Sequence, residues 1–168
     1  MAAARAAGVL VMHTMECHTP NLDDLPPTKR KRGNCSEGER IGDKAAMGRI
    51  LVRGEHGTGI VEDVAPIEGE KILYKPGKGA FWATEIHAYL QARGVTHLLL
   101  AGATTEVCVQ TTMREANDRG YECCIVGDAT GSYNPVFKKV ALEMVVAQGG
   151  IVGWQCPTAH VVERLSAK

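Results

Sequence analysis

From residue 71 onward, short apolar runs alternate with stretches of helical period, and this alternation constrains the fold more than any other feature of the sequence. Each helical stretch is about ten residues long, and three of them end at a glycine. Strands that alternate with helices form parallel sheets with right-handed crossovers. We therefore predict an α/β fold with a doubly wound, mostly parallel sheet. The predicted strands are 71–75, 97–101, 122–126 and 151–154, and the predicted helices are 84–93, 105–119, 137–148 and 158–165.

The first part of the chain has a less regular pattern. Residues 1–8 are Ala-rich and are typical of the end of a helix that Gly8 closes, and the apolar run 9–12 predicts a buried strand. Residues 14–48 are polar and contain three prolines, so we predict a long loop there. The basic tetrad 29–32 in this loop is interpreted as a solvated surface, with a localisation signal or an anion-facing lid as alternatives.

Composition narrows the class of protein. A chain of 168 residues with 45% apolar residues can bury one core, so we expect a single domain over residues 1–168. Lys and Arg number 19, as do Asp and Glu, so overall charge favours neither nucleic acid nor a membrane surface. No apolar run reaches the ~20 residues of a membrane span, and residues 1–8 do not resemble a signal peptide. None of the six cysteines has C-x-x-C spacing, and we expect a reduced, cytoplasmic protein.

The segment 102–109 is the first candidate site. It follows an apolar strand and opens a helix, which places it at the carboxyl end of a sheet strand, where open α/β folds bind ligands. Thr105 is predicted as the N-cap, and Cys108 then lies in the first helical turn. Free backbone N–H groups and the helix dipole at this place favour a thiolate and could stabilise an oxyanion. The alternative is a small cysteine that packs the helix against the sheet.

Lys75 is the second candidate, because it ends a predicted strand just before a Gly/Pro-rich turn. Its side chain could point into the same crevice as Cys108, where it would hold a thiolate by charge or polarise a carbonyl. The alternative is a surface turn with two solvated lysines, Lys75 and Lys78. The turn is not a phosphate-binding loop, because the order G-x-x-x-x-G-K-[ST] is absent.

Several other polar residues could carry chemistry. His13, Cys17 and His18 are close in sequence, but they have no convincing fourth ligand and Cys35 is distant, so we expect no metal site. A thiol redox protein is also disfavoured.

Two further features are open to more than one interpretation. Cys123 and Cys124 are adjacent in a predicted strand and should face opposite sides of the sheet, where packing is the simplest role. Gln148, which precedes two glycines, is either a polar residue at a helix end or a donor in the crevice.

Taken together and in this order, the motifs resemble the isochorismatase-like cysteine hydrolases. The two segments that carry the resemblance are KPGKGAFWAT and GATTEVCVQTTMREANDRGYECCIVGDA. Within that family the chain is most similar to biuret hydrolases and related ureide amidohydrolases, through HTMECHTPNLDDLPPTKRKRG, IGDKAAMGRILVRGEHG and AQGGIVG. The resemblance extends over nearly the whole chain.

The resemblance implies a Rossmann-like fold, no cofactor, and an Asp–Lys–Cys triad that hydrolyses a C–N bond of a small amide or ureide. Cys108 would be the nucleophile and Lys75 the triad lysine. The oxyanion would be held by the backbone amides of Thr104 and Cys108, after a cis peptide between residues 103 and 104. Gln148 would contact the substrate, and Lys78 is a weaker candidate for the same role. The thiolate would form a thioester, ammonia would leave, and water would release the acid.

The sequence departs from the family pattern at the base. In the family the aspartate ends a central strand that precedes the helix corresponding to residues 1–8, so this first strand is expected to be missing here. Asp23, Asp24 and Asp43 lie in the wrong segment for that role. The gap would leave an open edge at strand 97–101. We expect a chain with weak or no activity, or alternatively a non-catalytic relative that binds a ligand or partner in the crevice, and in either case a homo-oligomer.

Overall fold

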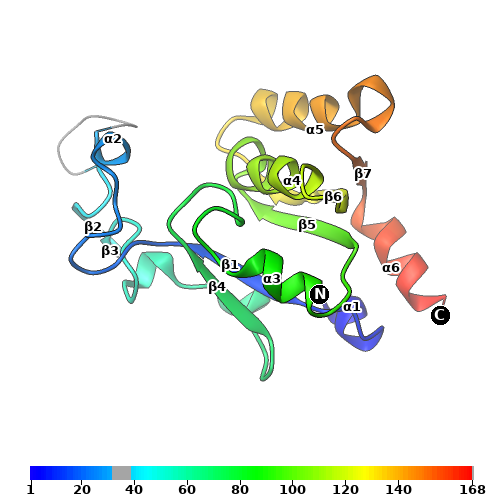
Figure 1. Cartoon of the computed structure of the whole chain (residues 1–168), viewed down its shortest axis with the longest axis horizontal. Coiled ribbons are helices and arrows are strands. Elements are labelled where there is room, and N and C mark those ends of the chain that lie inside the picture. Colours follow the sequence, from blue (N-terminus) through cyan, green and yellow to red (C-terminus); the bar gives the residue numbers. More distant parts are fainter. Residues whose placement is uncertain (32–38, 168) are drawn as a thin grey trace. The chain divides into compact units, whose positions relative to one another are not determined.

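The computed structural model describes residues 1–31 and 39–167, which form two compact units (Figure 1). One unit contains Met12–Gly77, and the other contains Met1–Val11 with Lys78–Lys168. The predicted α/β class is confirmed, because helices alternate with strands and the strands pair in parallel in two of the three sheets of the described residues. The last residue of the basic tetrad and Cys35 lie outside the described residues.

The unit Met12–Gly77 is built on a parallel pair of strands, β1 (Met12–Glu16) and β4 (Lys71–Lys75). Strand β4 has the predicted bounds. The predicted strand at 9–12 is wrong by several residues, because the pairing with β4 begins only at Met12, and Val9 and Leu10 remain exposed. The register pairs Glu16 with Lys75, so two oppositely charged residues end neighbouring strands.

The segment predicted as one loop contains short regular elements. Helix α2 (Pro27–Arg30) begins at a proline, whose fixed φ suits the first helical turn. Strands β2 (Lys44–Ala45) and β3 (Gly48–Arg49) form a small antiparallel ladder, and the 3₁₀ turns η1 (His56–Thr58) and η2 (Glu62–Val64) follow. The core of this unit consists of the buried side chains Cys17, Leu25, Val52 and Leu73.

The other unit contains a parallel sheet in the order β5 (His97–Ala103), β6 (Glu122–Gly131), β7 (Trp154–Cys156). The same unit contains five α-helices of the described chain (Figure 1). They are α1 (Ala2–Ala6), α3 (Ile86–Gln91), α4 (Gln110–Asn117), α5 (Pro135–Gly150) and α6 (Thr158–Ser166). The predicted strand at 151–154 is wrong by three residues, because the backbone of Gly149, Gly150 and Gly153 has positive φ and delays the start of β7.

Alternate residues of this sheet face opposite sides, as predicted for Cys123 and Cys124. Cys123 is buried at 2% exposure, whereas the thiol of Cys124 lies 3.4 Å from the thiol of Cys156 on β7. Cys123 thus packs in the core of the unit, and Cys124 packs against the neighbouring strand.

The edge of β5 is open in the described part of the chain, since β5 pairs with β6 alone. After His97 its side chains are apolar, and Leu99 keeps 49% of its surface exposed. An exposed apolar edge strand can pair with another chain, because its unpaired N–H and C=O groups can bond to a further strand.

Among the described residues, no helix has both the length and the apolar character needed to cross a bilayer.

Candidate functional site

Cys108 lies one turn beyond the end of β5. The chain leaves this strand through a cis peptide bond between Ala103 and Thr104, as the resemblance implied, and enters the five-residue π-helix η3 (Thr105–Val109). The carbonyl of Thr104 accepts hydrogen bonds from the N–H groups of Val107 and Val109 at 3.1 and 3.2 Å. Cys108 therefore lies in the first turn of a helix at the carboxyl end of a sheet strand, as predicted.

The prediction of Thr105 as N-cap is wrong, because Thr104 precedes the helix and Thr105 is its first residue. Thr105 is fully buried, and its hydroxyl donates a hydrogen bond to the carbonyl of Gly131 at 3.0 Å. A buried hydroxyl needs a partner, and β6 supplies it here. The Thr105 side chain thus fixes η3 to the end of β6 instead of closing the helix terminus.

Cys108 can be compared with two strand cysteines of the same unit, Cys123 and Cys124. Cys108 is half-buried, and its carbonyl accepts a hydrogen bond from the Thr112 hydroxyl at 2.7 Å. Burial raises the pKa of Cys123 to about 11, and burial together with the Cys156 thiol raises the pKa of Cys124 to about 12. These two cysteines stay protonated at neutral pH, so they are poor nucleophiles.

Two residues before Cys108, the Glu106 carboxylate has a hydrogen-bond partner among the described residues for only one of its two oxygens. Glu106 accepts a hydrogen bond from the Ser132 hydroxyl at 2.8 Å through Oε1, whereas its buried Oε2 has no hydrogen-bond partner among the described residues. This carboxylate helps to attach η3 to the segment after β6.

Lys75 is buried, so its interpretation as a solvated lysine is wrong. It is the last residue of β4, and its side chain is 3% exposed. The ammonium group donates a hydrogen bond to the carbonyl of Gly77 at 2.9 Å and lies 3.6 Å from Oε2 of Glu16. The carboxylate and the carbonyl together restrict where this buried ammonium group can lie.

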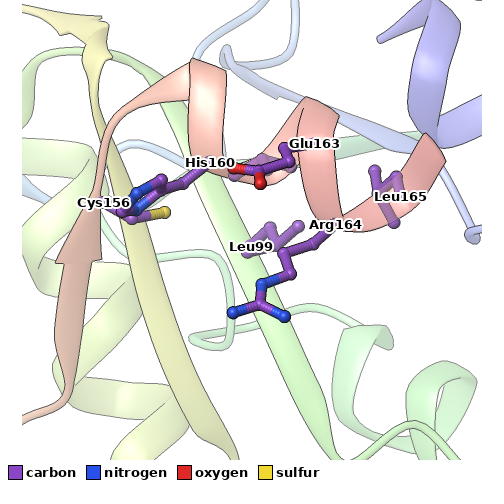
Figure 2. Close-up of a pocket in the computed structure, with 7 residues that line it drawn as sticks. Leu99, Cys156, His160, Glu163, Arg164 and Leu165 are labelled. Atoms are coloured by element: carbon purple, nitrogen blue, oxygen red, sulfur yellow. The ribbon is translucent and has the colours of Figure 1, made fainter. Parts of the chain in front are cut away.

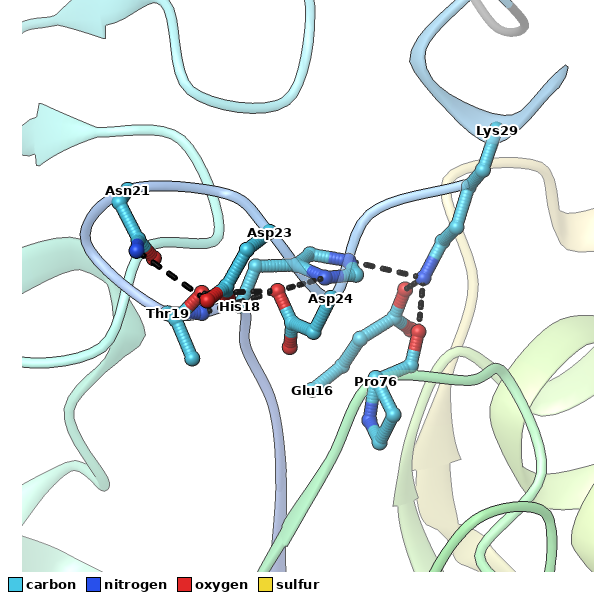
Figure 3. Close-up of polar contacts among 8 residues, drawn as sticks. All are labelled: Glu16, His18, Thr19, Asn21, Asp23, Asp24, Lys29 and Pro76. Carbon is cyan, nitrogen blue, oxygen red and sulfur yellow. Dashed lines mark hydrogen bonds and ion pairs between the residues drawn. The ribbon is translucent and has the colours of Figure 1, made fainter. Parts of the chain in front are cut away.

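A second lysine reaches the same carboxylate from α2, as Figure 3 shows. Nζ of Lys29 lies 3.0 Å from Oε1 of Glu16, bonds to Nε2 of His18 at 3.1 Å, and donates to the carbonyl of Pro76. We name Glu16, His18, Lys29 and Lys75 the Glu16 cluster. Sequence reasoning missed Glu16 and placed Lys29 in a solvated tetrad.

His18 is neutral at pH 7 in this environment. Burial lowers its pKa, and the neighbouring Lys29 charge lowers it further, although Asp24 acts in the opposite direction. With a neutral ring, Nδ1 donates to Oδ1 of Asp24 at 3.2 Å and Nε2 accepts from Lys29. Burial of Asp24 would raise the pKa of that carboxyl, but hydrogen bonds from Thr19 and the proximity of His18 lower it overall.

The residues considered as metal ligands have separate partners. Nε2 of His13 bonds to Glu70 at 2.9 Å, whereas His18 bonds to Asp24 and Lys29. In residues 1–31 and 39–167, no group of three or more His, Cys, Asp or Glu side chains is arranged to hold a metal ion.

The two candidate substrate contacts are exposed. Gln148 lies in a break near the end of α5 and has a left-handed backbone with φ of 54°, a conformation that non-glycine residues rarely adopt. Lys78 follows the Gly77 turn. Lys78, Cys108 and Gln148 belong to the same unit of the structure, and Lys75 belongs to the other.

Two shallow cavities lie in the unit that contains Cys108, and neither has Cys108 in its lining. One, of about 320 Å³, lies between α6 and the sheet and is shown in Figure 2. Its lining includes Leu99, Cys156, His160 and Arg164. The other, of about 410 Å³, lies between η3 and α5 and includes Glu106.

Comparison with known proteins places the chain in a family. The isochorismatase domain profile matches residues 1–154. The ureidoacrylate amidohydrolase RutB of Yersinia enterocolitica is 28% identical over 141 residues, which are 83% of this chain and 61% of that protein. The chain spans about half the length of the curated relatives that it matches, from 38% to 61% among those compared.

Solved structures agree with this assignment. An isochorismatase family protein from Desulfovibrio vulgaris is 26% identical with a TM-score of 0.79, and the match covers 98% of this chain and 80% of that one. A cysteine hydrolase from Pseudomonas syringae has the same fold, with a TM-score of 0.82 at 24% identity over 99% and 76% of the two chains. Since the domain profile matches most of its length, the chain belongs to the isochorismatase family.

Proposed function

We propose that this chain carries the nucleophile and the lysine of a cysteine amidohydrolase that cleaves a C–N bond of a small amide or ureide. The observation that carries the proposal is the position of Cys108, one turn into the helix that follows β5 and the cis peptide between Ala103 and Thr104. The likeness to ureidoacrylate amidohydrolases supports the choice of an amide or ureide substrate. A biuret-like ureide fits the same chemistry.

In the proposed reaction, the Cys108 thiolate attacks the carbonyl carbon of the substrate. The resulting oxyanion is stabilised by the backbone amides of Thr104 and Cys108 and by the charge of Lys75. The C–N bond then breaks, the nitrogen takes the proton that the thiol gave to the base, and ammonia leaves. Water hydrolyses the thioester and restores the thiol. Gln148, and less directly Lys78, would orient the substrate.

The base is the part of the triad that this chain does not supply in the expected place. The family assigns it to an aspartate at the end of a strand, whereas Asp23 and Asp24 lie in the turn after β1 and Asp43 precedes β2. Asp24 is also engaged with His18. We therefore propose that the chain alone turns over slowly or not at all, and that a supplied strand ending in Asp would raise its activity.

The direct test measures ammonia release from biuret and from ureidoacrylate, with and without a synthetic peptide that carries such a strand. We expect Cys108→Ala to abolish the release that the peptide supports. Cys124→Ala is the matched control, because Cys124 is a protonated strand cysteine, and it should retain activity. Ammonia release that persists in Cys108→Ala would show that another group is the nucleophile.

We propose a second candidate function from the positions of Asp23, Asp24 and Asp43, none of which lies at the place expected for the base. On this alternative the chain binds a ligand without hydrolysing it. Calorimetry with a ureide would then show binding to both wild type and Cys108→Ala, and mass spectrometry would detect the ureide unchanged after long incubation.

We also propose that the chain self-associates. An apolar strip along α5 supports this, since Val136, Phe137, Val140 and Met144 are each 44% or more exposed. Sedimentation velocity should show an oligomer, and Val140→Glu should shift it toward monomer.

A further inference from the structure

The Glu16 cluster lies at the carboxyl ends of β1 and β4, and Glu16 is its central residue. The parallel register sets Glu16 directly opposite Lys75. One carboxylate oxygen faces Lys29 at 3.0 Å, and the other faces Lys75 at 3.6 Å. The side chain of Glu16 is 9% exposed, so water contributes little to the charge balance of the cluster.

The contacts of Lys29 define what this residue can do. An ammonium group has three N–H donors. Lys29 directs its Nζ at three acceptors, namely Glu16, His18 and the carbonyl of Pro76, as the dashed lines of Figure 3 show. These acceptors use all its donors, which disfavours the anion-facing lid considered for the basic tetrad. Lys29 instead attaches the turn of α2 to the ends of the two strands.

His18 completes the arrangement because it can accept from Lys29 only while its ring is neutral. Its side chain is fully buried, and Asp24 fixes the tautomer by accepting the Nδ1 proton. The series of contacts from Asp24 through His18 and Lys29 to Glu16 therefore orients the carboxylate that faces Lys75. Each of these contacts lies within the unit Met12–Gly77.

We propose that Glu16 is the positioning residue of Lys75, and that Lys29, held by His18, keeps the Glu16 carboxylate in place. The proposal rests on the proposed function, in which Lys75 stabilises the oxyanion. Glu16 restricts where the Lys75 ammonium can lie and compensates its charge. Without this carboxylate two ammonium groups would share a buried site with a neutral histidine, which is unfavourable for both.

The test measures how fast an amine-specific acylating reagent modifies each lysine, followed by peptide mass spectrometry. In Glu16→Gln, which keeps the size of the side chain but removes its charge, we expect Lys75 to react about fivefold faster or more than in wild type. Glu16→Asp should restore part of the protection. Lys71 at the opposite end of β4 is the internal reference, and its rate should not change.

Glu70→Gln is the matched control, since it removes a carboxylate of the same unit that bonds to His13. We expect the rate at Lys75 to stay within about twofold of wild type in this variant. If Glu16→Gln does not fold, Lys29→Gln is tested instead. This variant keeps Glu16 but removes the ammonium group that holds its carboxylate, so the acylation rate at Lys75 should also rise. An unchanged rate at Lys75 in the folded variant, or an equal rise in Glu70→Gln, would overturn the proposal.

This experiment separates the proposal from the proposed function, because acylation of a lysine needs no turnover. If Cys108→Ala has no effect on ammonia release, the amidohydrolase reaction fails while the result at Lys75 stands. In a form with measurable turnover, Glu16→Gln should lower kcat by about tenfold or more and leave KM within about twofold, since the lysine acts on the transition state.

Discussion

At the scale of single residues, His18 connects the charges of the Glu16 cluster. Its pKa is lowered first by burial and then by Lys29, and Asp24 opposes both. We therefore expect Lys29→Gln to raise the pKa of His18 and Asp24→Asn to lower it further. Titration of the ring protons by NMR measures both shifts. Shifts of the opposite sign would show that the contacts in Figure 3 are not formed in solution.

Thr105 is the residue that fixes the helix of Cys108 to the sheet, and its hydroxyl is the group that does so. Thr105→Val keeps the shape of the side chain but removes the buried hydroxyl that donates to the carbonyl of Gly131. We expect a loss of about 1–2 kcal/mol in the free energy of unfolding. Thr104→Val is the control, because the Thr104 side chain makes no capping hydrogen bond. Urea unfolding compares the two variants, and equal losses would contradict the role given to Thr105.

At the scale of elements, the sequence predicted the strands and helices whose bounds depend on a short run of neighbouring residues. Strand β4 has the bounds that its apolar pattern indicated, since a polar turn follows it directly. The start of β7 was misplaced because three glycines with positive φ carry the chain past the apolar run. The position of Cys108 in a first helical turn followed from the strand-to-helix transition at residue 104.

The Glu16 cluster could not be predicted in the same way. Its carboxylate and the Lys29 ammonium are 13 positions apart in a polar segment without regular pattern, and they meet only because the turn after β1 folds back. The pairing of Glu16 with Lys75 depends on a parallel register, which no hairpin turn determines. The sequence signal was one acidic residue at a strand end, which is too common to indicate a site.

Among the elements, β5 combines an apolar surface with an open edge, which predicts weak solubility. Leu99→Lys places a charge on this strand, and lysine on an edge strand opposes pairing with another chain. We expect light scattering to show slower aggregation at high protein concentration than in wild type. Val162→Lys, which changes an apolar residue of comparable exposure on α6, is the control and should have a smaller effect.

At the scale of the whole molecule, the lowered pKa of His18 makes stability depend on pH. Between the unfolded value of about 6.5 and the lower folded value, the unfolded chain binds more protons. The free energy of unfolding should therefore fall as the pH is lowered from 7.5 through 6.5. The pKa values of Asp23, Asp24 and Asp128 are also lowered, by hydrogen bonds in each case, so a further loss should follow near pH 4 and below.

Urea unfolding at pH 7.5, 6.5 and 5.5 measures the first of these losses. His18→Gln, which cannot bind the proton, should show a flatter dependence over this range. A dependence identical to that of wild type would mean that His18 does not titrate differently in the folded state.

The central claim is that Cys108 is the nucleophile of a ureide or amide hydrolase. The most direct measurement incubates the protein with a ureide in the presence of the Asp-bearing peptide, stops the reaction with acid, and locates any acyl group by peptide mass spectrometry. The account predicts an acyl adduct on the peptide that contains Cys108, absent from Cys108→Ala. An adduct on another cysteine, or ammonia release without involvement of Cys108, would contradict it.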